Sequence, residues 1–124
     1  MLDKLTQTSD YNSGAYNVLV MNEATRNAVA EALENLASQQ SWNSAVWQQC
    51  FNLVTANWHD ELMEFVHHDL IHYDDVFHPR HISVLAVKPE VSHRLDDYRQ
   101  EFRAVAAALR ANMSLMEAKK QFGL

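Results

Sequence analysis

The sequence predicts a mainly α-helical protein, a compact bundle of four to five helices, and three observations support this fold class. Glycine and proline are scarce, with two of each in 124 residues, whereas sheet-rich domains need turn residues at roughly every 8–12 positions. Nearly half of the residues are apolar (48%), enough to build a hydrophobic core. Apolar residues also recur at steps of three and four, the spacing that places side chains on one face of a helix.

The domain organisation that we expect is a flexible N-terminal arm at residues 1–14 followed by a single helical domain at residues 15–124. The arm is polar and ends at a glycine, and a chain of this length fits one core. Two short apolar segments leave an alternative open. Residues 82–87 are either a strand paired with residues 15–21 in a two-stranded ribbon, or a helix that starts near Pro79.

The first helix is predicted to begin after Asn22, a good N-cap residue, with Glu23 in its first turn. The next segment, which begins near Ser41, is the most apolar part of the chain. Its large side chains follow one continuous helical stripe: Trp47, Phe51, Val54, Trp58, Leu62 and Phe65. A break near Asn57 stays open. The stripe fails at Asp69, which predicts either a bend in the helix or a buried acid with a partner.

The last long segment has a heptad-like seam of alternating four- and three-residue steps. The seam residues are Val91, Leu95, Tyr98, Phe102, Val105 and Leu109. The seam is shorter than the three to four heptads of a typical coiled coil, which favours packing within one bundle over a homodimer. Ser114 and Glu117 have the spacing of a capping box, and Gly123 is a typical end for the short helix that follows.

Several functional classes are disfavoured by what the sequence lacks. Cys50 is the only cysteine and lies among large apolar residues, so we expect a buried thiol and no disulfide. The first residues do not resemble a signal peptide and no segment has the length of a membrane span, so we expect a cytoplasmic protein without membrane contact. Nucleophile-elbow and glycine-rich nucleotide motifs are absent, which favours a non-enzymatic role without excluding an enzyme.

The charge distribution is the most unusual feature of the sequence. The chain has a net charge of −6, but residues 27–79 contain no lysine or arginine and eight acids. An acidic surface disfavours direct nucleic-acid binding, which depends on neutralising phosphates. In the simplest interpretation the basic C-terminal helix packs beside the acidic segment and the charges cancel. The alternative is an acidic surface that attracts a basic protein partner.

The second alternative predicts a non-enzymatic protein-interaction module, such as an acidic adaptor, an inhibitor or an immunity-type protein. The acids that we expect to contact the partner are Asp60, Glu61, Glu64, Asp74 and Asp75. On a helical projection, Glu61, Glu64, His68, His72 and Asp75 share one face beside the apolar stripe.

The same helix suggests a different function, that of a metal-binding protein or metalloenzyme. The candidate ligands are Glu64, His67, His68 and His72, with Glu31 or Glu34 from the first helix as further ligands. Imidazole and carboxylate groups suit divalent transition metals, and Glu64-x-x-His67 has the spacing of di-iron bundles. The second Glu-x-x-His of such a site is absent. An ordinary solvated helix with histidines beside acids is the simpler explanation and the one we favour, and we expect no other cofactor.

Overall fold

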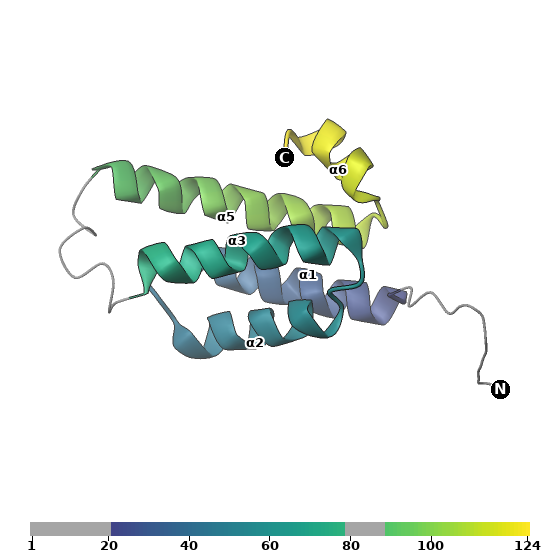
Figure 1. Cartoon of the computed structure of the whole chain (residues 1–124), viewed down its shortest axis with the longest axis horizontal. Coiled ribbons are helices and arrows are strands. Elements are labelled where there is room, and N and C mark those ends of the chain that lie inside the picture. Colours follow the sequence, from purple (N-terminus) through teal and green to yellow (C-terminus); the bar gives the residue numbers. More distant parts are fainter. Residues whose placement is uncertain (1–20, 79–88) are drawn as a thin grey trace.

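The computed structural model describes residues 21–78 and 89–124, and these residues form five helices (Figure 1). The four long helices are α1 (Glu23–Ala37), α2 (Ser44–Ala56), α3 (Glu61–Phe77) and α5 (Pro89–Arg110). The short helix α6 (Leu115–Phe122) follows α5 and turns back over its C-terminal end. The predicted mainly helical bundle is thereby confirmed. The predicted arm at 1–14 and the ribbon of 15–21 with 82–87 lie outside the described residues, except for Met21.

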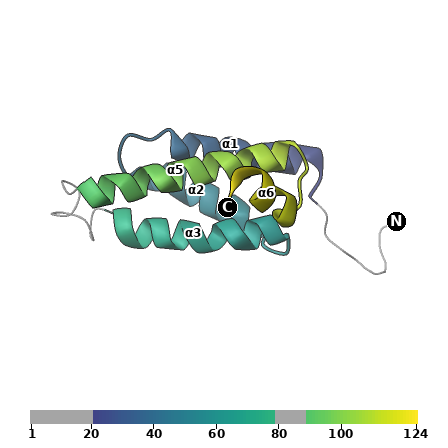
Figure 2. The ribbon, with the colours of Figure 1, turned by 90° about the horizontal axis from the view of Figure 1, so that it is seen from above.

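The four long helices form a bundle in which successive helices run in opposite directions (Figures 1 and 2). Helix α5 packs against both α1 and α3, and α2 packs against the same two helices from the other side. Helices α1 and α3 therefore lie diagonally across the bundle (Figure 2). This arrangement separates the acids of α1 from those of α3.

Short polar side chains set where the helices begin. The side chain of Asn22 accepts a hydrogen bond from the backbone N–H of Thr25 at 2.8 Å, which confirms the predicted cap of α1. Ser114 and Glu117 form the predicted capping box of α6. Gly123 ends α6 with a φ of 71°, a left-handed conformation that glycine adopts without steric cost.

The apolar stripe of the second segment is divided between two helices. Helix α2 ends at Ala56, and the side-chain amide of Asn57 donates to the carbonyl oxygen of Leu53 at 2.9 Å. The chain then turns before α3 begins at Glu61. The stripe is thus not continuous, and Trp58, which it would bury, has 55% of its surface exposed in the connection.

The core lies between the four long helices and uses the predicted seam of α5. The largest fully buried side chains are Phe102, Leu33, Leu36, Met63, Leu70, Leu109, Val29, Val54, Val66, Val105 and Cys50. The seam therefore closes the core of a single chain, and its buried part offers no surface to a second copy. Burial raises the pKa of the Cys50 thiol to about 12, which keeps it protonated as expected for a small hydrophobic residue.

Arginines join the ends of α1 and α5. The Arg26 guanidinium donates to the carbonyl oxygen of Leu109 at 3.1 Å, near the end of α5. In the opposite direction, Arg103 donates to the carbonyl oxygen of Ala37 at 3.2 Å and Arg99 donates to that of Gln39 at 2.6 Å. Arg26 and Arg103 thus bind carbonyl groups in the last turn of a helix, which have no intrahelical partner, and Arg99 binds a carbonyl group just beyond the end of α1.

A bilayer-spanning helix needs about 20 mostly apolar residues, and the helices within residues 21–78 and 89–124 include none of that kind.

We predict that Phe102→Ala lowers the free energy of unfolding by about 3–5 kcal/mol, because it leaves a cavity in a fully buried position. Phe122→Ala is the matched control, since the Phe122 side chain on α6 is 38% exposed and its loss should cost far less. Urea unfolding followed by circular dichroism measures both. Equal losses would show that α5 does not form the centre of the core.

Candidate functional site

The site begins with Asp60, which sets the start of α3. Its carboxylate accepts hydrogen bonds from the backbone N–H groups of Leu62 at 2.9 Å and Met63 at 3.4 Å. Helix α3 then buries one face against the core, made of Leu62, Met63, Val66, Leu70, Tyr73 and Phe77. This inward face fixes which side chains of α3 remain in contact with water.

The exposed side chains of α3 form a surface that we call the outer face. It consists of Glu61, Glu64, His68, Ile71, His72 and Asp75, all of them exposed. Five of these six residues are those expected from the helical projection, and the structure places them together. The sixth, Ile71, is 38% exposed and adds an apolar side chain to the charged surface.

The five acids predicted to contact a partner have different roles in the structure. Asp60 is partly buried as the cap of α3, and Glu61 accepts a hydrogen bond at 3.3 Å from the backbone N–H of Leu115, at the start of α6. Asp74 is also partly buried. Glu64 and Asp75 are exposed and form no ion pair among the described residues. These two therefore carry the most available charge of the outer face.

Three of the described arginines of α5 contact α1 or the residues that follow it and not the outer face of α3, whereas Arg94 extends toward α3 beside Tyr98. Arg99 and Arg103 donate to carbonyl groups at the end of α1, and Arg110 forms a 2.7 Å ion pair with Glu34 of α1. Of α6, Lys119 lies 5.6 Å from the ring centre of Phe65 on α3. The C-terminal helix was expected to cancel the charge of the acidic segment. The ion pair that does so joins Arg110 of α5 to Glu34 of α1.

The four candidate metal ligands do not converge on one point. The His67 ring stacks on Phe51 of α2 with ring centres 5.0 Å apart, whereas the rings of His68 and His72 lie 5.0 Å from each other on the outer face. Glu34 is held by Arg110, and α1 is diagonal to α3. Within the described part of the chain, no group of three or more His, Cys, Asp and Glu side chains is assembled to hold a metal ion.

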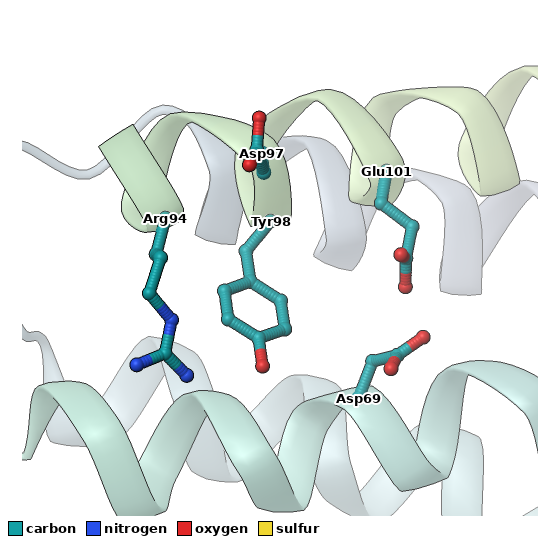
Figure 3. Close-up of a pocket in the computed structure, with 5 residues that line it drawn as sticks. All are labelled: Asp69, Arg94, Asp97, Tyr98 and Glu101. Atoms are coloured by element: carbon teal, nitrogen blue, oxygen red, sulfur yellow. The ribbon is translucent and has the colours of Figure 1, made fainter. Parts of the chain in front are cut away.

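A second feature, the contact of Asp69 with Glu101, was only half predicted. Asp69 was expected to bend the helix or to be a buried acid with a partner, and the structure shows the partner. Asp69 on α3 and Glu101 on α5 point toward each other (Figure 3). A side-chain hydrogen bond with Asp69 is one of the causes that raise the pKa of Glu101. We call these two residues the carboxyl pair. Glu101 lies beside the seam, three residues after Tyr98 and four before Val105, and this spacing was the available signal.

The carboxyl pair holds a proton. Burial of Glu101, followed by the hydrogen bond and the negative charge of Asp69, raises the pKa of Glu101 to about 8. The Oε2 atom of Glu101 is buried without a hydrogen-bond partner among the described residues, and such a position disfavours a charge. At neutral pH the Glu101 carboxyl is therefore protonated.

The carboxyl pair lies in a shallow pocket of about 290 Å³ between α3 and α5, whose lining also includes Arg94, Asp97 and Tyr98. The side chains of Arg94 and Tyr98 extend from α5 toward α3, whereas Asp97 points away from it (Figure 3). Burial raises the pKa of Tyr98, and the hydrogen bond and charge of Arg94 oppose this shift. The phenol thus remains protonated at neutral pH beside the carboxyl pair.

Comparison with models of protein families, with curated proteins and with solved structures finds no match for the chain.

The capping role of Asp60 can be separated from its charge. We predict that Asp60→Ala lowers the free energy of unfolding by about 1 kcal/mol, because two backbone N–H groups of α3 lose their acceptor. Asp60→Asn removes the same charge but keeps an oxygen that accepts these hydrogen bonds, so most of the stability should remain. Urea unfolding of both variants measures the difference. Equal losses would assign the role of Asp60 to its charge.

The proton of the carboxyl pair makes stability depend on pH. Because the pKa of Glu101 rises from 4.5 to about 8 on folding, its contribution is complete below pH 4.5, declines as the pH rises and is lost above pH 8. In Glu101→Gln an amide replaces the protonated acid. We predict that this variant is more stable than the original protein at pH 9, and that the gain shrinks toward pH 5.

Urea midpoints between pH 5 and pH 9 test this prediction. Glu64→Gln is the control, because it changes an exposed carboxyl group of α3 that lies outside the carboxyl pair. A difference between Glu101→Gln and the original protein that stays constant with pH would contradict the shared proton.

Proposed function

We propose that this protein is a non-enzymatic protein-interaction module, an acidic adaptor or inhibitor, that binds a basic partner protein through the outer face of α3. Glu64 and Asp75 supply the main charges of this surface, and Glu61 and Asp74 extend it. The observation that carries the proposal is the C-terminal end of α3. Its last turn contains acids and no basic residue.

Acids at that position are unfavourable for the helix itself. The C-terminus of a helix carries a partial negative charge, and a like charge in the last turn costs about 0.3–1 kcal/mol at an exposed position. Asp75 lies in the last turn, is exposed, and receives no compensating ion pair among the described residues. A lysine or arginine from a partner would relieve this repulsion. The favourable electrostatic energy that the folded chain lacks at this helix end would then contribute to the binding affinity.

The use of arginines elsewhere in the bundle supports the same proposal. The Arg99 and Arg103 side chains are held at the end of α1, and Arg110 is paired with Glu34. The acidic surface of α3 therefore retains a field that steers a positively charged protein and selects against acidic ones.

Two apolar side chains supply contacts that charge alone does not. Ile71 lies on the outer face, and Trp58 is 55% exposed in the connection that precedes α3. Tryptophan is enriched among the residues that contribute most to binding energy at protein interfaces. An acidic surface with exposed apolar side chains nearby suits a basic partner that also presents an apolar patch.

The substitution Asp75→Lys tests the proposal because it should change stability and binding in opposite directions. It places a positive charge at the C-terminus of α3, so we predict that the free energy of unfolding rises by about 0.5–1 kcal/mol. Partner affinity should fall by about tenfold or more, since two like charges then face each other. A loss of binding accompanied by a gain in stability cannot be attributed to misfolding.

Glu31→Lys is the matched control, because it makes the same change of charge at an exposed position of α1, across the bundle from α3. Each immobilised variant is incubated with a lysate of the source cells, and the retained proteins are compared by mass spectrometry. The partner is a protein retained by the original chain and by Glu31→Lys but lost with Asp75→Lys. Its affinity is then measured with purified components at 50 and 200 mM salt, where the affinity should fall as salt increases. If both variants retain the same proteins, the outer face is not the binding surface.

A further inference from the structure

His68 and His72 are adjacent on the outer face of α3. Their spacing of four residues places the two side chains one turn apart, and the ring centres are 5.0 Å apart with an angle of 33° between the planes. Both residues are exposed, and within the described residues neither ring forms a hydrogen bond or an ion pair. Their nitrogen atoms are therefore available to a ligand from solvent.

This geometry suits two imidazoles that bind the same metal ion. Divalent transition metals bind histidine nitrogen at about 2.0–2.1 Å, and two such rings at neighbouring coordination positions have centres about 5 Å apart. The observed separation of 5.0 Å already has this value. Rotation of the two exposed side chains can direct one nitrogen of each ring toward a common ion.

The other residues of the predicted metal site have different positions. His67 is turned toward α2, where its ring stacks on Phe51, and it does not face His68 or His72. Glu64 lies one turn before His68 on the same exposed face, and Asp75 lies one turn after His72. Both acids lower the electrostatic cost of placing a cation between them.

We propose that His68 and His72 chelate one divalent transition-metal ion of the zinc, copper and nickel class on the outer face of α3. Water fills the remaining coordination positions in the free protein. A second step rests on the proposed function: the bound cation cancels part of the negative charge of the outer face and thereby weakens its attraction for a basic partner. The metal would then regulate the same surface that binds the protein.

Calorimetric titration of the full chain with zinc chloride at pH 7.5, after removal of metals with a chelator, tests the chelate without a partner. We expect one binding event of one zinc ion per chain, and we expect its affinity to fall at least tenfold in His68→Ala and in His72→Ala because a single imidazole cannot chelate. His93→Ala is the control, since His93 is an exposed histidine on α5 that pairs with Asp97. Copper should bind more tightly than zinc at the same site.

Two results would overturn the chelate: no stoichiometric zinc binding by the original chain, or binding that His68→Ala and His72→Ala leave unchanged. Thermal unfolding provides a second measurement. Zinc should raise the Tm of the original chain and of His93→Ala, because a ligand that binds only the folded state stabilises it. Zinc should leave the Tm of His68→Ala unchanged, and an equal rise in that variant would also overturn the chelate.

The regulatory step is tested separately with the partner captured on the outer face. Partner affinity is measured with saturating zinc and with a chelator, for the original chain and for His68→Ala. We expect zinc to weaken binding by the original chain only. If zinc binds at His68 and His72 but partner affinity is the same in both conditions, the regulation is wrong while the chelate stands. If Asp75→Lys retains every partner in the chelator, the proposed function fails independently of the metal.

Discussion

Helix α1 ends without a basic residue in its last turn, and the arginines of α5 supply the positive charge near its free carbonyl groups. Arg26 of α1 makes the reciprocal contact near the end of α5. Because α1 and α5 run in opposite directions, the start of each helix lies beside the end of the other, within reach of an arginine side chain. The partial negative charge at the C-terminal end of each helix is thereby offset by arginine from the other helix. Helices α1 and α5 also pack together more extensively than any other pair of the bundle.

This use of arginine determines the charge of the rest of the surface. A guanidinium that donates to a carbonyl group at the end of α1 is not available to an acid on α3, which lies diagonally across the bundle. Helix α3 is instead held by its apolar inward face and by the carboxyl pair. Its contact with α5 therefore includes a proton-sharing interaction between Asp69 and Glu101, whereas the ion pair of Glu34 with Arg110 belongs to the contact of α1 with α5.

Much of this fold could be predicted from the sequence because it depends on local patterns. The caps at Asn22 and Ser114, the seam through Phe102 and the exposed face through Glu64 all follow from spacing along one helix. The sequence leaves a break near Asn57 open, because the apolar steps continue through it and do not by themselves decide between one helix and two. The pattern showed that Asp69 needed a partner but did not identify it, since Glu101 is on another helix and the pairing depends on the register of α3 against α5. For the same reason, the sequence grouped His67 with His68, although the His67 ring packs on Phe51 of α2 and His68 lies on the outer face.

The inward and outward faces of α3 obey different physical requirements. The inward face must bury apolar area, and Asp69 beside it must share a proton with Glu101 of α5; both requirements concern the folded chain alone. Apart from Glu61, which accepts a hydrogen bond from Leu115, the outer face meets no such requirement. Asp75 opposes the dipole of its own helix, and the side chains of Glu64 and His68 form no hydrogen bond or ion pair with another described helix. Charge at the outer face can therefore change with little loss of core packing, and at Asp75 its reversal favours the helix. The charge of this surface can therefore change without a large change in the stability of the fold. A cation or a protein can bind there and leave again without unfolding the bundle, as a reversible binding surface requires.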